Sequence, residues 1–123
     1  MKLLDLFEQK IDNSKFKISK NGLNFIKCKE GFSSKEYLDS NKVKVIGYGT
    51  KLKNGDKTIS EKEAESRLLL FIEDNVHKHL RNPNIIKVQL NQRQFDALCS
   101  LLYNIGIYRS VVFLQHSLKK SPN

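Results

Sequence analysis

The sequence lacks the long apolar runs that a membrane span requires. Its longest uninterrupted apolar run is Leu68–Ile72, far short of the roughly 18–20 residues that cross a bilayer. The N-terminus meets Asp5 and Glu8 at once, which breaks the apolar region of a secretory signal. We therefore expect no integral membrane segment, no signal peptide and synthesis in the cytoplasm.

Cysteine and histidine are also scarce, and none is spaced as in a zinc or redox motif. We expect Cys28 and Cys99 to be reduced and buried or half-buried, although the sequence alone leaves a disulfide open. His77 and His79 lie two positions apart on an expected helix, so they point to different faces. The sequence predicts no metal site and no cofactor, and it contains no glycine-rich phosphate loop.

What the chain has is positive charge. Its 123 residues carry a net charge of +9, with the 39% hydrophobic content of one globular domain. A basic surface attracts polyanions such as nucleic acid, anionic lipid or an acidic cell-wall polymer. The sequence shows no helix-turn-helix signature and no basic stripe with interleaved aromatics. We therefore expect no nucleic acid partner and keep a nucleic-acid-binding module as an alternative only.

Hydrophobic periodicity predicts an α+β fold with its strands near the N-terminus. Ser19, Ser60 and Asn91 are each placed to cap the start of a helix, and Ser60 opens a capping box. The predicted elements are a helix over 20–30, a hairpin or meander over 35–50, a long helix over 61–80, a helix over 92–104 and a short helix over 111–114.

Residues 1–17 are interpreted as an N-terminal extension of a domain that covers 18–123. An apolar face that begins at Leu3 and extends to Ile11 predicts a short helix. A helix packed on the main domain and an arm that docks on a partner protein both fit this pattern. The main domain divides into an α/β lobe over 18–59 and a linking helix with a helical lobe over 60–123.

A carboxylate ends the apolar stripe of the first predicted helix. Leu23 and Ile26 lie on this stripe, Glu30 follows on the same face, and Gly31 is placed to end the helix. The helix macrodipole disfavours an anion at this end, and burial disfavours it further, so both raise the pKa of Glu30. A general acid that works near neutral pH needs such a pKa. A surface glutamate before a glycine stop is the alternative.

Four separated motifs stand in order along the chain: Glu30–Gly31, Tyr37–Asp39, Ile46–Thr50 and Asp96–Gly106. Together they resemble the T4-type phage lysozymes, or endolysins, over about residues 18–106. The resemblance implies a cleft between a small α/β lobe and a helical lobe joined by a long helix. It also implies hydrolysis of the β-1,4 bond between N-acetylmuramic acid and N-acetylglucosamine in peptidoglycan, at the bacterial cell wall.

The same resemblance assigns the catalytic carboxylates. Glu30 matches the general acid, and Asp39 matches the carboxylate that helps to hold the attacking water and stabilises positive charge on the sugar. The family's third catalytic position, a threonine, is Val45 here, which keeps the strand but lacks the hydroxyl. Lys44 points to the opposite face and does not replace it. The alternative is therefore a catalytically impaired protein that binds peptidoglycan or a protein partner.

Two further residues match polar or aromatic positions near the family's substrate. Tyr48 and Asn104 are expected to contact the substrate, with simple packing and helix capping as their respective alternatives. The apolar residues of the helix over 92–104 belong to the core rather than to the site; they are Phe95, Leu98 and Leu102.

Two departures from the family pattern affect the shape of the site. Lys42 replaces the family's turn glycine, so we expect Asn41 to take part of the positive φ that the turn requires. Related lysozymes continue beyond the position of Asn123, which implies a shortened helical lobe. A protein partner is then expected either at that lobe or at residues 1–17.

Overall fold

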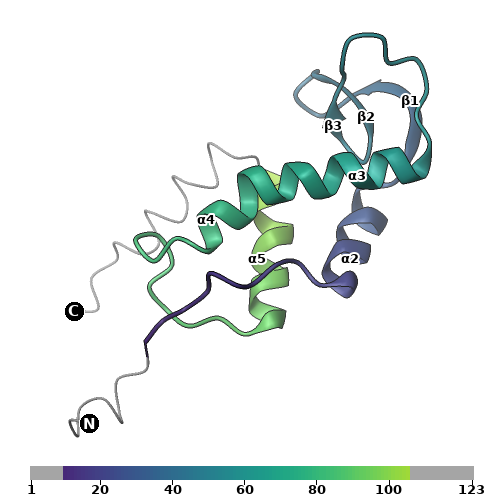
Figure 1. The fold of residues 1–123 in the computed structure, drawn as a ribbon. Helices are drawn as coiled ribbons and strands as arrows, with labels where there is room; N and C mark the ends of the chain where they lie inside the picture. Colours follow the sequence, from purple (N-terminus) through teal and green to yellow (C-terminus); the bar gives the residue numbers. More distant parts are fainter. Residues whose placement is uncertain (1–9, 106–123) are drawn as a thin grey trace, which may run out of the picture.

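The computed structural model describes residues 10–105, in which a small sheet and several helices surround one core (Figure 1). The α+β organisation expected from the sequence is confirmed. Figure 1 shows the sheet beside the first turns of α3, with α2 and α5 side by side on another side of that helix. The elements are α2 (Lys20–Glu30), β1 (Ser33–Leu38), β2 (Lys44–Gly47), β3 (Thr50–Lys51), α3 (Glu61–Ile72), the π-helical η1 (Glu73–His77), α4 (Lys78–Leu80) and α5 (Gln92–Ile105).

Helix α2 begins and ends where the sequence predicted. The Ser19 side chain accepts a hydrogen bond from the Gly22 backbone N–H, and Gly31 follows the helix with a φ of 72°. Ser19 also holds α2 against α5, because both its backbone N–H and its hydroxyl donate to the Asp96 carboxylate. A Cβ on Gly22 would lie 2.6 Å from the Asp96 Cγ, so only glycine permits this close approach.

The three strands form an antiparallel sheet in the order β1-β2-β3, in which Tyr37 faces Val45 across the strand pair. The turn between β1 and β2 corrects one expectation. The residue with positive φ is Lys42 itself, at 61°, and Asn41 does not take that role. The Lys42 backbone N–H donates to the Asp39 carbonyl at 2.9 Å, and the positive φ of Lys42 then turns the chain back so that the Val43 carbonyl accepts from the Asp39 N–H at 2.9 Å.

The long helix predicted over 61–80 is present as the continuous run α3, η1 and α4. The Ser60 hydroxyl accepts from the Glu63 backbone N–H at 3.0 Å, as its capping box predicted. The predicted apolar stripe is fully buried at Ala64, Leu68 and Ile72. The sequence pattern missed the π-helical segment Glu73–His77, which widens the helix for more than one turn.

Helix α5 supplies the centre of the core. Asn91 and Gln94 exchange hydrogen bonds between their side chains and each other's backbone N–H groups, so the predicted cap is confirmed. Phe95 and Leu102 are buried, as predicted, and Leu98 packs against the same core. The short helix predicted over 111–114 lies outside the described residues.

Residues 10–17 contradict part of the expected N-terminal helix. Ile11 is 41% exposed and belongs to no helix. The Asn13 side chain instead bonds the backbone of Val88 and Leu90, and Phe16 stacks on Phe95 at 5.3 Å between ring centroids. This segment is fixed to the loop before α5, because its polar backbone groups find partners there. Residues 1–9 lie outside the described part, and the boundary at residue 17 stays a prediction.

The two cysteines differ in their exposure to solvent, and His77 is buried. Cys99 is buried but Cys28 is exposed, which corrects the expectation that both are at least half-buried; both thiols are free. The ring of His77 is buried, and its Nε2 accepts from the Ile18 backbone N–H at 3.0 Å. Within residues 10–105, no group of three His, Cys, Asp or Glu side chains is placed to hold a metal ion. No helix in the same range is long and apolar enough to cross a membrane.

Candidate functional site

A cavity of about 760 Å³ lies between the sheet and the helices, and we call it the carboxylate cavity. The sheet side contributes Glu30 at the end of α2 and the turn that follows β1, while α3, η1 and α5 contribute the opposite side. Four of the five site residues predicted from the sequence line it together: Glu30, Asp39, Val45 and Asn104.

Glu30 is the last residue of α2, so the helix carries its carboxyl group to the edge of the sheet. The side chain is half-buried, and this burial raises the pKa of Glu30, against the opposing positive charge of Lys29. The sequence predicted a raised pKa at this residue, and burial is the cause that the structure shows. Glu30 is thus held closer to its protonated form at neutral pH than an exposed glutamate.

Asp39 is fixed by the turn that it begins. Its Oδ1 accepts from the backbone N–H groups of Asn41 and Val43, at 2.8 and 2.9 Å. Its own N–H donates to the Val43 carbonyl, which closes the turn from the other side. Within residues 10–105 no hydrogen bond reaches Oδ2, so this oxygen is free to face the cavity. The turn therefore orients one carboxylate oxygen and leaves the other for a ligand.

Val45 lies in the wall of the cavity and brings no polar atom to it. The side chain is 3% exposed and lies in β2, with Lys44 exposed on the other face of the strand, as alternation predicted. Thr50 does not supply the missing hydroxyl, because its Oγ1 donates to the Ile46 carbonyl within the sheet at 3.3 Å.

Tyr48 does not line the cavity, which contradicts its expected contact with the substrate. Its ring is 2% exposed, and its hydroxyl donates to Glu61 at the start of α3 at 2.9 Å. Phe32 packs on the ring, and the Lys27 ammonium lies 5.6 Å from the ring centroid. Tyr48 packs here because the tight turn between β2 and β3 directs its side chain toward α2 and α3 rather than toward the cavity.

Two tyrosines that the sequence analysis did not assign to the site surround Glu30. A Cβ built on Gly49 would lie 3.4 Å from Glu30 Oε2, 3.6 Å from the Tyr103 hydroxyl and 3.7 Å from the Tyr37 hydroxyl. Gly49 has a φ of 89°, so a side chain here would be strained and would also fill the space between these groups. Strand alternation places Tyr37 on the face of Asp39, and this was the available signal for it.

The two phenols differ in their partners. The Tyr103 hydroxyl donates to the Tyr48 carbonyl oxygen at 2.6 Å, whereas no hydrogen bond within residues 10–105 reaches the Tyr37 hydroxyl. Burial raises the pKa of Tyr103 well above its usual range, and the charge of Glu30 adds to this. Both phenols therefore remain neutral near pH 7.

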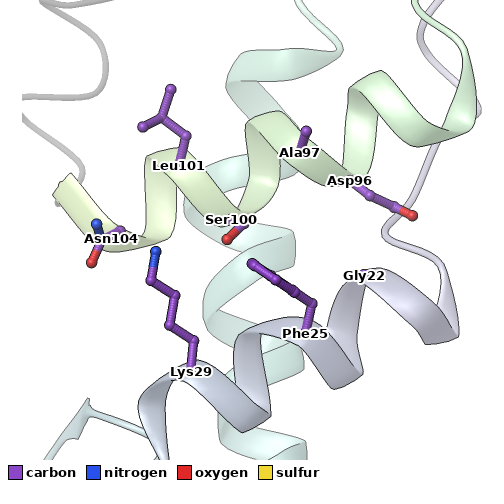
Figure 2. A pocket seen from close by; sticks show the side chains of 8 residues that line it. All are labelled: Gly22, Phe25, Lys29, Asp96, Ala97, Ser100, Leu101 and Asn104. Atoms are coloured by element: carbon purple, nitrogen blue, oxygen red, sulfur yellow. The ribbon is translucent and has the colours of Figure 1, made fainter.

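Asn104 lies where the carboxylate cavity meets a second hollow of about 370 Å³ between α2 and α5 (Figure 2). In Figure 2, Phe25 and Lys29 project from α2 toward Ser100 and Asn104 on α5. This hollow is mainly apolar, and the single carboxylate among the described residues that line it, Asp96, is bound to Ser19. It lacks the paired carboxylates of the first cavity, so we place the candidate active site in the carboxylate cavity.

Glu30 and Asp39 have different environments within one cavity. The half-buried Glu30, whose pKa is raised by burial, is suited to donate a proton, while the Asp39 carboxylate is held in place by two backbone N–H groups. Two carboxyl groups that divide these roles across a bond to be cleaved are the usual arrangement of glycoside hydrolases. An arrangement of this kind is chemically able to support acid-catalysed hydrolysis.

Sequence comparison identifies relatives among phage proteins. The sequence model of the phage lysozyme family matches residues 27–121. The endolysin of Salmonella phage P22 is 36% identical over 98 residues, which are 72% of this chain and 63% of that protein. The chain thus spans less than two thirds of the length of this relative.

Structural comparison leads to the same group. The endolysin from Escherichia coli O157:H7 phage FAHEc1 matches with a TM-score of 0.68 and 34% identity, over 84% of this chain and 68% of that one. The muramidase domain of SpmX from Asticaccaulis excentricus matches with a TM-score of 0.67 and 28% identity, over 79% and 65%. The lysozyme-like fold expected from the sequence is confirmed by these similarities.

Proposed function

The chain belongs to the phage lysozyme family, and on this premise we propose that it hydrolyses bacterial peptidoglycan. The bond is the β-1,4 glycosidic bond between N-acetylmuramic acid and N-acetylglucosamine. One observation carries the proposal: Glu30, with its raised pKa, and Asp39, anchored by its turn, line the same cavity. Such a pair is what glycosidic hydrolysis requires.

In the proposed reaction, Glu30 donates its proton to the glycosidic oxygen as the bond from that oxygen to the sugar C1 breaks. The free Oδ2 of Asp39 stabilises the positive charge that develops on the sugar and holds the attacking water. The water forms the new bond to C1 and releases its proton toward Asp39. Asn104 is the proposed substrate contact from α5, and Tyr48 is left out because it is buried.

The proposed place of action is the bacterial cell wall, reached after synthesis in the cytoplasm. The net charge of +9 favours adsorption to an anionic wall polymer. A protein partner at residues 1–17 or at the C-terminal side of the helical lobe is part of the same proposal. Both proposed catalytic carboxylates lie within the described residues, so the proposed chemistry draws its acid and its charge-stabilising group from this chain.

Val45 favours a second candidate function, a lysozyme-fold protein that binds peptidoglycan without cleaving it. At 3% exposure in the cavity wall, this side chain offers the attacking water no hydrogen bond. Water positioning of this kind is worth roughly 10²–10⁴ in rate. The two candidates differ in one observable: the first releases sugar fragments and the second only sediments with the wall.

The test is release of soluble muropeptides from purified peptidoglycan, identified by mass spectrometry. We expect the wild type to release fragments with new reducing ends, and Glu30→Gln to lower the rate by roughly 10³-fold or more. Asp39→Asn should also lose activity, while Glu36→Gln serves as the matched control, since Glu36 is exposed on β1 and does not line the cavity. Wall binding by an inert wild type would support the second candidate.

A further inference from the structure

We propose that the Tyr37 hydroxyl replaces the hydroxyl that is missing at position 45 and positions the attacking water. The inference rests on the proposed function and adds a residue to it. Tyr37 keeps its own proton throughout: the water gives up its proton toward Asp39, and the phenol only donates a hydrogen bond to the water oxygen or accepts one from it.

The first support is the register of the sheet. Tyr37 lies directly opposite Val45 in the antiparallel pair of β1 and β2. Directly opposed residues project to the same face, with their Cβ atoms roughly 4.5–5.5 Å apart. Both side chains line the carboxylate cavity. The phenol is longer than valine, so from the opposed position it can bring a hydroxyl into the cavity that both residues line.

The second support is the position of the hydroxyl relative to Glu30. A Cβ built on Gly49 would lie 3.4 Å from Glu30 Oε2 and 3.7 Å from the Tyr37 hydroxyl. The distance between these two oxygens therefore cannot exceed the sum of the two values. The Tyr37 hydroxyl therefore lies in the part of the cavity that Glu30 faces, where the sugar to be cleaved has to bind. Gly49 keeps this part of the cavity open because it has no side chain.

The third support is that the hydroxyl is available. Within residues 10–105 every buried side-chain oxygen has a hydrogen-bond partner, and the Tyr37 hydroxyl has none, so it must be accessible from the cavity. The neighbouring Tyr103 hydroxyl is already bound to the Tyr48 carbonyl. Of the two phenols beside Glu30, only Tyr37 has its O–H donor left for water within residues 10–105, because the Tyr103 O–H is donated to the Tyr48 carbonyl.

The charges around Tyr37 agree with this placement. Burial raises the pKa of Tyr37, and the negative charges of Glu30 and then Asp39 raise it further. The phenol is therefore close enough to both carboxylates to be influenced by each. It also stays protonated at neutral pH, so it can donate a hydrogen bond throughout the reaction.

The test is a double-mutant cycle of Tyr37→Phe and Val45→Thr, measured as kcat and KM for muropeptide release. Tyr37→Phe should lower kcat by roughly 10²-fold with KM nearly unchanged, because the ring and its packing remain. Adding Val45→Thr should restore most of this loss, since the family's hydroxyl then returns. In the wild type, Val45→Thr alone should have a much smaller effect. Thermal unfolding of each variant checks that the fold is kept.

The outcomes separate this inference from the proposed function. Full activity in Tyr37→Phe, with Glu30→Gln inactive, would overturn the inference and leave the function in place. A loss in Tyr37→Phe that Val45→Thr does not restore would also overturn it. A wild type that is inert until Val45→Thr is introduced would show that the phenol is no substitute, while the carboxylates act. If every variant is inert, the proposed function fails and the inference with it.

Discussion

Tyr103 donates a hydrogen bond of 2.6 Å from its hydroxyl to the backbone carbonyl oxygen of Tyr48. The contact joins α5 to the turn between β2 and β3, directly beside Glu30. Phe71 packs edge-on against the Tyr103 ring, with 5.5 Å between the centroids, and so fixes the ring from α3. One side chain thus ties the sheet to the helices at the base of the carboxylate cavity.

Removing this hydroxyl should loosen that connection. We expect Tyr103→Phe to lower the free energy of unfolding by about 1–2 kcal/mol, because the partly buried Tyr48 carbonyl loses its partner. Urea unfolding followed by circular dichroism measures the change. Tyr37→Phe is the matched control: it removes a phenol hydroxyl from the same cavity that has no protein partner within residues 10–105. Equal losses in the two variants would contradict the assigned role of Tyr103.

The turn at Lys42 leads to the prediction of a substitution that stabilises the fold. Its φ of 61° places a lysine in the left-handed region, which costs a residue with a Cβ roughly 1–2 kcal/mol. Lys42→Gly should remove this cost. Glycine also gives the unfolded chain more conformational freedom, which opposes the effect, so we expect the free energy of unfolding to rise by about 0.5–1 kcal/mol in total. Activity should persist, because the Asn41 and Val43 N–H groups still hold Asp39.

The control for this turn lies two residues further along the chain. Lys44→Gly removes the same side chain from strand β2, where glycine weakens an extended backbone. We expect Lys44→Gly to lower the melting temperature and Lys42→Gly to raise it. A lower melting temperature in Lys42→Gly would show that the lysine side chain contributes more than the backbone conformation costs.

Local patterns in the sequence predicted the helices well, for a physical reason. The caps at Ser19, Ser60 and Asn91 are short-range bonds from a side chain to a backbone N–H within the same turn. The apolar stripe of α3 is likewise a property of neighbouring residues. Glu30 and Asp39 were identified by a resemblance to a family, and the structure adds that they share one cavity.

The features that the sequence missed depend on partners far along the chain. Strand alternation could not say whether Tyr48 faces the cavity or the core, because Glu61 and Lys27 decide this. Asp96 belonged to a family motif, but its bond to Ser19 joins residues 77 positions apart. The position of Phe16 depends in the same way on Phe95. Local periodicity contains no information on such pairs.

His77 predicts a loss of stability in mild acid. Burial lowers the pKa of His77, although Glu73 opposes this effect and Arg81 adds to it. Its Nε2 accepts from the Ile18 N–H, so a proton on this nitrogen would break the bond. A folded-state pKa below the unfolded value of roughly 6.5 means that the unfolded chain binds the proton first. This stability is fully present above that pH and is lost as the pH falls below it.

Urea unfolding at pH 7.5 and pH 5.5 measures this effect. The wild type should be less stable at pH 5.5, and His77→Gln should be less stable at both values with a smaller difference between them. His79→Gln is the control, because burial and Lys78 also lower the pKa of His79. This variant should reduce the difference in stability between pH 7.5 and pH 5.5 only by the contribution of His79 itself. An unchanged difference in His77→Gln would assign the acid sensitivity to other groups.

The charge next to Glu30 predicts a shift in the pH profile of the proposed hydrolysis. A general acid must be protonated to act, so activity should fall as the pH rises through the pKa of Glu30. Burial raises this pKa, and the positive charge of Lys29 lowers it. Lys29→Gln removes the opposing charge, so we expect the alkaline limb of kcat/KM to move to higher pH.

Two controls make this test specific: a series of ionic strengths and a substitution of a second lysine. Lys29 is exposed, so screening should shrink the difference between Lys29→Gln and the wild type as the ionic strength rises. Lys20→Gln removes the same charge from the other end of α2 and should leave the alkaline limb in place. If Lys20→Gln and Lys29→Gln move the limb equally, the shift reflects weaker adsorption of a less basic protein to the wall. A shift in Lys29→Gln alone assigns the limb to Glu30, because only that lysine lies close enough to change its proton affinity.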